Sequence, residues 1–310
     1  MNALDDNDVR AALSWDAVLN SLETAFQTPA NYFSPERVVI PAPEAGSYLT
    51  MPCADAKGWF GVKQVGVIPT NMARGLPTVQ AHYTLMNPHG TPVLSAAATV
   101  LTRIRTAGAS ALAARYLAPQ DARTLLIIGT GSLAPYMAQA HAHVRNYEQI
   151  FVWGRDEGKA AQTVREVQKE VVGVEVSVAS NLEEVLGWAD TVSAATTSSQ
   201  PLVRAEFLRE GLRGGQHIDL VGAFKPEMRE SDSQTVRKAE VFVDDLEAAQ
   251  IEAGDLILAA QEGWSFDEVK GDLSSLVLGR TKRSSEEVTT LFKSVGVALE
   301  DLAVAKLLVR

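Results

Sequence analysis

Short apolar runs alternate with amphipathic helical patterns between about residues 121 and 245. The apolar runs are LLIIG at 125–129, IFVWG at 150–154, VEVSVA at 174–179, DTVSAAT at 190–196, HIDLVG at 217–222 and EVFVDD at 240–245. Between them lie the helical patterns SLAPYMAQAHAHV, DEGKAAQTVREVQKEV, NLEEVLGWA and VRAEFLREGL. Apolar segments separated by amphipathic helices are typical of a parallel sheet that helices cover on both faces. The pattern therefore predicts a doubly wound α/β domain.

The first 115 residues show a different pattern. An amphipathic helical opening precedes the strand-like segments RVVIPAP, GWFGVKQVGVIP and AHYTLMN. Pro and Gly in NPHGTP predict a hairpin turn at 87–92, because these residues supply the dihedral angles of a chain reversal. The segment TTLFKSVGVALEDLAVAKLLVR is expected to form an amphipathic helix that packs on one lobe or on a partner subunit. We expect an α+β lobe of residues 1–115 with the C-terminal helix 286–310, and a separate domain over 116–285.

A glycine-rich element stands between the first apolar run of that domain and the helical pattern after it. It reads Gly129, Thr130, Gly131, Ser132, Leu133 and Ala134. In such a GxGxxA turn Gly129 permits the tight bend, Gly131 lets the backbone approach a pyrophosphate, and Ala134 allows close packing of helix on strand. The helix N-terminus then offers free N–H groups to the phosphates. The context predicts a Rossmann dinucleotide site; the alternative is a glycine turn that binds no ligand.

The end of the next apolar run bears on the choice of nucleotide. An acidic residue about 20 positions after the glycines normally binds the ribose 2′-hydroxyl of NAD. Here Gly154 and Arg155 stand at that place, and Lys159 adds a second positive charge. A guanidinium group suits a 2′-phosphate, so we expect NADPH to be preferred over NADH. In the alternative interpretation Arg155 is a solvated surface charge and Asp156 binds the ribose.

Composition excludes several classes of protein. The chain has 310 residues, 46% of them hydrophobic, and a formal net charge of -10. Disordered chains and small disulfide scaffolds are excluded, and neither nucleic acid nor a membrane surface is an expected partner. The single cysteine, Cys53, and an acidic opening without signal-peptide character favour a cytoplasmic location. The five histidines show no ligand spacing, so no metal site is expected.

Several widely separated segments carry a more specific pattern. They are Arg37 before the Met51-Pro52 pair, GVKQVGVIPTN, GLPT, LTRIRTAGASALAARYLA, GTGSLA, AATTSSQP, GQHIDLVGAFKPEMRESD, VFVDD and FKSVGVALEDLA. In this order they resemble the ornithine cyclodeaminase/mu-crystallin family over nearly the whole chain. The resemblance implies an N-terminal lobe that binds substrate and forms a homodimer, joined to a Rossmann domain that holds NAD(P).

The resemblance also assigns residues to roles. The carboxylate of the substrate would be held by Arg37, Lys63 and Arg105, with Met51 beside them, and Lys63 is the candidate proton donor; an ordered water is the alternative. For each of these cations the alternative role is a surface salt bridge. The implied cofactor residues are Thr78, Arg105, Thr106, the turn 129–134, Arg155, Lys159, Thr196, Leu220, Val221 and Ser294. At Thr196 and Ser294 the alternative is a hydroxyl group that caps the local backbone.

Two departures from the family pattern bear on the reaction. Cyclodeaminases resemble a GGD-x-PGK pattern whose aspartate is the acid/base, and Phe224 occupies that position here. Ala97 stands where many relatives carry aspartate. Because phenylalanine cannot accept a proton, deamination of ornithine is disfavoured. The segment GAFKPEMRE resembles the branch of the family that reduces cyclic ketimines, which implies 1-pyrroline-2-carboxylate or 1-piperideine-2-carboxylate as the substrate. The alternatives are an ornithine cyclodeaminase, an open-chain amino-acid dehydrogenase and a non-catalytic NADPH-binding protein.

Overall fold

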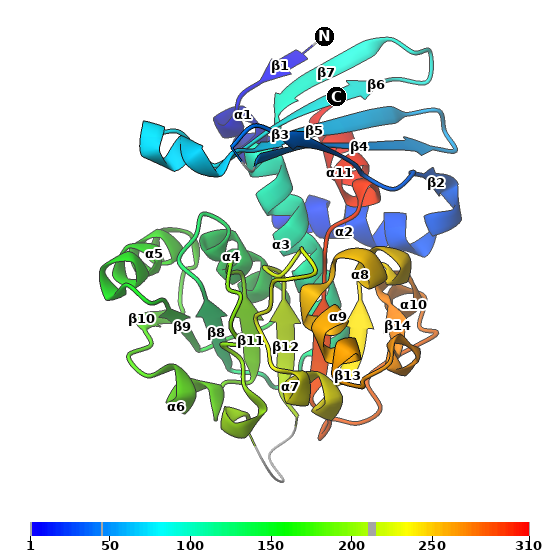
Figure 1. The fold of residues 1–310 in the computed structure, drawn as a ribbon. Helices are drawn as coiled ribbons and strands as arrows, with labels where there is room; N and C mark the ends of the chain where they lie inside the picture. Colours follow the sequence, from blue (N-terminus) through cyan, green and yellow to red (C-terminus); the bar gives the residue numbers. More distant parts are fainter. Residues whose placement is uncertain (1, 45, 210–214, 310) are drawn as a thin grey trace. The chain divides into compact units, whose positions relative to one another are not determined.

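The structure, a computed structural model, describes residues 2–44, 46–209 and 215–309. The chain divides into two compact units. The first unit comprises Met1–Thr106 and Gly296–Arg310, and the second comprises Ala107–Val295. The chain therefore leaves the first unit once, within a long helix, and returns to it once, after residue 295 (Figure 1).

The first unit is built on a sheet in the order β1-β7-β6-β5-β4-β2, with β3 also paired to β4. Its strands are β1 Asn2–Leu4, β2 Tyr32–Phe33, β3 Val38–Ala42, β4 Gly46–Asp55, β5 Phe60–Val67, β6 Val79–Met86 and β7 Pro92–Ala97. Its helices are α1 Asp6–Ala12, α2 Trp15–Gln27, α11 Ala298–Ala305 and the start of α3 Ala98–Leu117. The expected hairpin turn is confirmed, because β6 and β7 pair antiparallel around residues 87–91.

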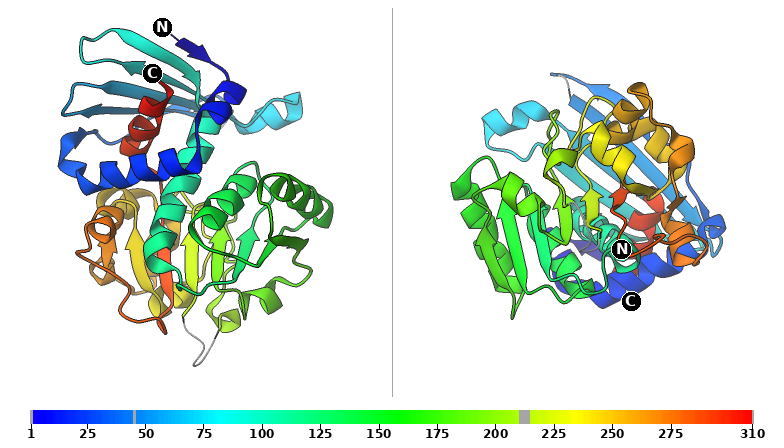
Figure 2. Two further views of the ribbon diagram at one scale, coloured as in Figure 1. Left: turned by 180° about the vertical axis from the view of Figure 1, so that it is seen from behind. Right: turned by 90° about the horizontal axis from the view of Figure 1, so that it is seen from below.

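Helices α2 and α11 pack together, and α11 also packs on β4 and β5 of the sheet (Figure 2). Strands alternate their side chains between two faces, and the face toward these helices carries Met51, Lys63 and Tyr83 side by side on β4, β5 and β6. Every residue of α11 is buried. Charged groups on α11 therefore lie inside the first unit.

The prediction of one continuous helix from residue 289 onward is wrong. Thr290–Lys293 forms strand β15 of the second unit, and the helix begins only at Ala298. Between them Gly296 has a φ of +79°, a left-handed conformation that ends regular structure and favours glycine. Leu291 and Phe292 are fully buried, so the apolar positions that suggested a helix face fill a central strand instead.

The second unit contains a sheet in the order β10-β9-β8-β11-β12-β15-β13-β14, with all neighbours parallel. Its strands are β8 Thr124–Ile128, β9 Gln149–Trp153, β10 Glu175–Val178, β11 Thr191–Ala194, β12 His217–Leu220, β13 Glu240–Val243, β14 Gly271–Asp272 and β15 Thr290–Lys293. Its helices are the remainder of α3, α4 Ala134–Val144, α5 Glu157–Glu170, α6 Leu182–Leu186, α7 Ser233–Lys238, α8 Leu246–Glu252, α9 Gly254–Gln261 and α10 Leu273–Val277. The doubly wound α/β fold is confirmed.

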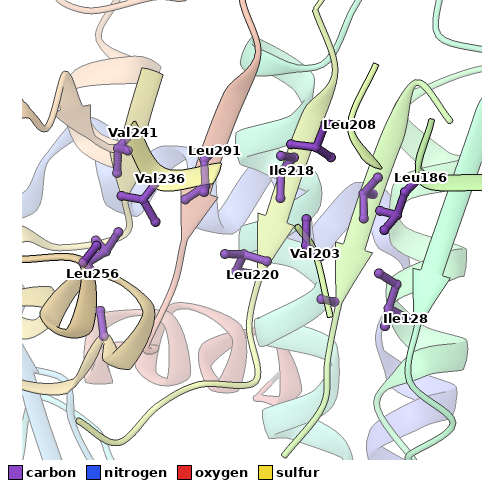
Figure 3. Packing of buried hydrophobic residues seen from close by; sticks show 14 of the residues in the cluster. Ile128, Leu186, Val203, Leu208, Ile218, Leu220, Val236, Val241, Leu256 and Leu291 are labelled. Atoms are coloured by element: carbon purple, nitrogen blue, oxygen red, sulfur yellow. The ribbon is translucent and has the colours of Figure 1, made fainter. Parts of the chain in front are cut away.

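The core of this unit lies between the sheet and its covering helices. Ile128, Ile218, Leu220 and Leu291 from three strands, β8, β12 and β15, pack into one cluster of buried apolar side chains (Figure 3). The helix expected over VRAEFLREGL is wrong for its first part, where only a single 3-10 turn forms at Ala205–Phe207. Residues 210–212 of that segment lie outside the described residues.

The order of the strands determines where a ligand binds on such a sheet. Strand β8 has β9 on one side and β11 on the other. The chain adds β9 and then β10 on one side of β8, and it continues with β11 on the opposite side. Ligands of open parallel sheets bind at the carboxyl ends of the strands, at this switch point. The turn after β8 is the glycine-rich element, so the fold presents it at the expected place.

Candidate active site

The three cations expected to bind a carboxylate lie together in the first unit. Lys63, on β5, is 1% exposed, and Arg105, on α3, is 5% exposed. Met51 of β4 is directly opposite Lys63 in the sheet register and is also buried. Arg37 is partly buried and donates from Nη2 to the carbonyl oxygen of Gly296 at 2.5 Å. The alternative of surface salt bridges does not fit Lys63 and Arg105, because both are buried.

Two carboxylates of α11 hold these cations in place. Asp301 lies between them, with Oδ2 2.7 Å from Lys63 Nζ and Oδ1 3.1 Å from Arg105 Nε. Glu300 Oε2 lies 2.5 Å from Arg105 Nη1. Both acids are fully buried. Because Asp301 contacts a sheet residue and a helix residue at once, it fixes the spacing of the two cationic groups.

Gly296 brings the third cation to the same place. A Cβ atom at this position would collide with the guanidinium of Arg105, so only glycine lets the backbone lie against that group. The carbonyl oxygen of Gly296 accepts the hydrogen bond from Arg37. Arg37 and Arg105 therefore both lie against Gly296, in the peptide segment that leads into α11.

The cluster combines cations and carboxylates. Lys63 and Arg105 pair with Glu300 and Asp301, and Arg37 joins them through the carbonyl oxygen of Gly296. Burial and the positive charge of Arg105 lower the pKa of Lys63, Asp301 raises it, and the resulting value is about 8. Lys63 therefore carries its proton at neutral pH.

Glu300 and Asp301 are functional candidates that sequence reasoning did not assign. The signal was present as two adjacent acids within the apolar segment ALEDLAVA. Charged residues are almost never fully buried unless they are paired. An acidic pair within an apolar helix is therefore a sign of buried cations nearby.

The glycine-rich turn of the second unit has the geometry of a phosphate site. Gly129 has a φ of +124°, and a Cβ there would lie 2.7 Å from the carbonyl oxygen of Ala195. A Cβ at Gly131 would meet no atom within 4 Å, so the space above this residue is open. Helix α4 starts at Ala134 without a side-chain cap on its N–H groups. Open space above Gly131 and a helix N-terminus fit a pyrophosphate.

The nucleotide-selecting residues follow β9 at the same edge of the sheet. Arg155 and Lys159 are both exposed. Asp156 caps α5, because its Oδ1 accepts the N–H of Lys159 at 3.0 Å. This cap engages one carboxylate oxygen of the residue that was the alternative ribose partner. The choice between the two interpretations stays a prediction, tested below.

The remaining cofactor candidates divide between the units. Leu220, Val221 and Ser294 stand at the carboxyl ends of β12 and β15, and the N–H of Ser294 bonds to the carbonyl of Leu220. All three are buried. Thr78 and Thr106 belong to the first unit and are partly buried. Their contact with a nucleotide stays a prediction.

Thr196 follows β11 and uses its hydroxyl group within the chain. The hydroxyl donates to Glu230 at 2.8 Å and accepts the N–H of Ser198 at 3.3 Å. This is the local capping that the sequence left open as the alternative at this position. Any contact between Thr196 and a nucleotide would then involve its other atoms.

Two histidines of the second unit, His141 and His217, are buried beside polar partners. His141 lies 3.2 Å from Asp219, and His217 lies 2.9 Å from the hydroxyl of Thr290. Burial lowers the pKa of His217 to about 3, so it is neutral at physiological pH.

In the part of the chain that the structure describes, no group of three or more His, Cys, Asp or Glu side chains could hold a metal ion. Across the same residues, no helix combines the length and the apolar character that crossing a bilayer requires.

Comparison with known proteins places these features in a family. The model of the ornithine cyclodeaminase/mu-crystallin family matches residues 2–310. A delta(1)-pyrroline-2-carboxylate reductase of Bacillus cereus is 33% identical over 320 residues, covering 99% of this chain and 95% of the relative.

Solved structures agree with this comparison. The delta(1)-pyrroline-2-carboxylate reductase of Thermococcus litoralis, solved with NADH and L-proline, superposes with a TM-score of 0.93 at 33% identity, covering 99% of this chain and 96% of that one. An archaeal alanine dehydrogenase dimer with bound NAD gives a TM-score of 0.90 at 30% identity, covering 99% and 94%. The relatives thus include both a pyrroline-2-carboxylate reductase and an alanine dehydrogenase.

Proposed function

Since the chain belongs to the ornithine cyclodeaminase/mu-crystallin family, we propose that it reduces cyclic ketimines with a nicotinamide cofactor. The proposed substrate is 1-pyrroline-2-carboxylate, which yields L-proline, and 1-piperideine-2-carboxylate, which yields L-pipecolate, is the second. The observation that carries the proposal is the cluster of Arg37, Lys63 and Arg105, cations that suit a substrate carboxylate, of which Lys63 and Arg105 are buried and held by Glu300 and Asp301.

The cations orient the substrate. An arginine guanidinium binds a carboxylate through two parallel hydrogen bonds, which fixes the plane of the group as well as its position. Arg105 and Arg37 supply this clamp, and Glu300 and Asp301 keep Arg105 in one rotamer. The carbon of the C=N bond is the neighbour of the carboxylate, so the clamp also fixes the carbon to be reduced.

Lys63 supplies the proton. A reduced nicotinamide bound at the second unit would supply the hydride. As the hydride reaches the imine carbon, the electrons of the C=N bond move to nitrogen, where the Lys63 ammonium gives up a proton and becomes a neutral amine. Water returns a proton to Lys63 after each turnover. A pKa of about 8 keeps the donor charged at pH 7 yet close to the value at which proton transfer is efficient.

The exposed Arg155 supports NADPH as the preferred cofactor, with NADH as the second choice. The relative from Thermococcus litoralis was solved with NADH, so the preference is a property to measure in this chain. We also expect a homodimer, as in the archaeal alanine dehydrogenase; sedimentation velocity at micromolar concentration tests this.

The second candidate function is an open-chain amino-acid dehydrogenase, which the alanine dehydrogenase relative favours. A cyclodeaminase is disfavoured, because Phe224 offers no acid/base where that reaction needs one. A protein that binds NADPH without turnover is the remaining alternative.

One panel of assays tests the proposal. The oxidation of NADPH at 340 nm is followed with 1-pyrroline-2-carboxylate, with 1-piperideine-2-carboxylate and with pyruvate plus ammonia, and ammonia release from L-ornithine is measured with NAD. We expect both cyclic imines to be reduced fastest. Lys63→Met should lose most of this activity, whereas Lys57→Met, which removes an exposed lysine from the turn before the same strand, should keep it. Faster ammonia release from ornithine, or binding of NADPH without any turnover, would refute the reductase.

A further inference from the structure

A buried carboxylate joins two loops at the ligand-binding edge of the second unit. Glu230 is fully buried, and Oε1 accepts the N–H of Thr196 at 2.6 Å and its hydroxyl at 2.8 Å. Oε2 accepts the N–H of Gly222 at 2.6 Å. Thr196 follows β11, and Gly222 follows β12. One side chain therefore holds the backbones of two adjacent strand ends.

Gly222 shows how closely these loops approach. A Cβ atom there would collide with the carbonyl oxygen of Thr196 and would lie 2.5 Å from Glu230 Oε1. Glycine at this position lets the carboxylate reach both N–H groups. We refer to residues 194–196 and 220–222, tied together by Glu230, as the shelf.

A second acid and a lysine hold Glu230 itself. Asp255, at the start of α9, accepts the N–H groups of Glu230 and Ser231 at 2.7 and 2.8 Å. Lys293, at the end of β15, is fully buried with Nζ 3.4 Å from Asp255 Oδ2. The fixed backbone leaves the Glu230 side chain little freedom to move away from the shelf.

The place of the shelf assigns it to one half of a dinucleotide. In this fold the two mononucleotide halves lie on either side of the switch point, with the pyrophosphate at the glycine turn between them. The adenosine half faces β8 and β9, where Arg155 follows β9. The other half, which carries the nicotinamide, then faces β11 and β12, the strands that end in the shelf.

We propose that Glu230 is a positioning residue for the nicotinamide half of the cofactor, acting through the backbones of Thr196 and Gly222 and making no contact with the nucleotide itself. The proposal rests on the proposed function only in requiring that the second unit binds a dinucleotide. This role differs from a general stabilising role, because loss of the shelf would weaken binding of the nicotinamide half and leave binding of the adenosine half unchanged.

The test compares two ligands that share the adenosine half. Binding of NADH and of ADP-ribose, which lacks the nicotinamide, is measured by calorimetry on wild-type protein and on Glu230→Gln. Glutamine keeps the size of the side chain but places an NH2 group against one of the N–H donors. We expect the dissociation constant of NADH to rise about tenfold and that of ADP-ribose to stay within twofold. The fluorescence enhancement of bound NADH should also fall.

Asp190 provides a matched control. Its Oδ2 accepts two backbone N–H groups, from Arg123 and Thr124, and the hydroxyl of Thr124, which is the same set of donors that Glu230 accepts. Asp190 precedes β11 and its partners precede or begin β8, so this contact lies at the opposite edge of the sheet. Asp190→Asn should lower the melting temperature and leave both dissociation constants unchanged.

A second variant tests the same contact if Glu230→Gln does not fold. Asp255→Asn loosens the backbone of Glu230 without changing its side chain, and we expect a smaller loss, about threefold, that again affects NADH alone. Equal weakening of both ligands, or no change in either, would overturn the role of Glu230 while leaving the reductase proposal intact. Failure of the wild-type protein to bind NADH, ADP-ribose and also NADPH would refute the reductase proposal and the shelf together.

Discussion

The pair formed by Lys63 and Asp301 makes a sharp prediction about the pH dependence of catalysis. Asp301→Asn keeps the size of the side chain and removes the charge that lies 2.7 Å from Lys63 Nζ. Burial and Arg105 both lower the pKa of Lys63, and Asp301 is the group that opposes them. In the variant the ammonium form therefore loses its main stabilisation.

The size of the effect follows from the distance. Two opposite unit charges about 4 Å apart interact with about 4 kcal/mol at an effective dielectric constant of about 20. One pKa unit corresponds to about 1.4 kcal/mol, so the pKa of Lys63 falls by about 3 units, from about 8 to about 5. At pH 7 about 1% of Lys63 then carries a proton, and kcat/KM should fall on the order of 100-fold.

The assay is the pH profile of kcat/KM for 1-pyrroline-2-carboxylate between pH 5 and pH 9. In the wild type the rate should decline above pH about 8, and in Asp301→Asn the decline should begin about 3 units lower. Ionisation of the imine itself is the same for both proteins, so the difference between the profiles reports on the enzyme. An alkaline limb that stays in place in Asp301→Asn would refute Lys63 as the proton donor.

Glu300→Gln is the matched control for this experiment. Glu300 is the neighbouring acid on the same helix, is equally buried and contacts Arg105. Its removal should raise KM for the imine, because Arg105 loses a partner that orients it. The alkaline limb should move less than in Asp301→Asn, since Asp301 is the acid that contacts Lys63 Nζ and Glu300 contacts Arg105.

Three further predictions concern the nucleotide, the substrate and the stability of the fold. Arg155→Asp should shift the ratio of kcat/KM for NADPH over NADH at least about tenfold toward NADH; an unchanged ratio would remove Arg155 from the selection of the cofactor. Phe224→Asp should slow ketimine reduction about tenfold if its ring faces the substrate, whereas unchanged kinetics would show that it does not. The pKa of His217 is lowered from 6.5 to about 3, so the unfolded chain binds more protons than the native one between these values and stability falls as the pH falls through this range. Urea unfolding at pH 6.5 and pH 5 should show a loss of about 2 kcal/mol that is absent in His217→Gln, and an equal loss in both proteins would contradict this assignment.

The sequence predicted the second unit well because its strands β8, β11 and β12 are buried on both faces. Such strands read as short, continuous apolar runs, and five runs of this kind precede or follow clear helical patterns. Strand β15 was missed because Leu291 and Phe292 merge with the apolar positions of α11 into one apparent helical pattern. The break between them depends on Gly296, whose left-handed backbone is not visible in a hydrophobicity pattern.

The sequence predicted only the cationic residues of the candidate site. The family resemblance selected Arg37, Lys63 and Arg105, and the structure places them around one segment of the chain. The balancing acids, Glu300 and Asp301, were not found. On a surface helix two polar residues in sequence indicate the solvent side, and only the packing of α11 on β4 and β5 buries them. Charge compensation between distant segments is a property of the tertiary structure.

The order of strands in the second unit has a consequence for how the protein is made. Strand β15 lies between β12 and β13, and β13 and β14 pair with the rest of the sheet only through it. A nascent chain that has not yet emerged beyond residue 290 therefore exposes β13 and β14 as a separate ribbon with an unpaired edge, the kind of surface that chaperones protect. Asp301 follows the last strand of the sheet within ten residues, so the sheet of the second unit and the cationic cluster both depend on the last stretch of the chain.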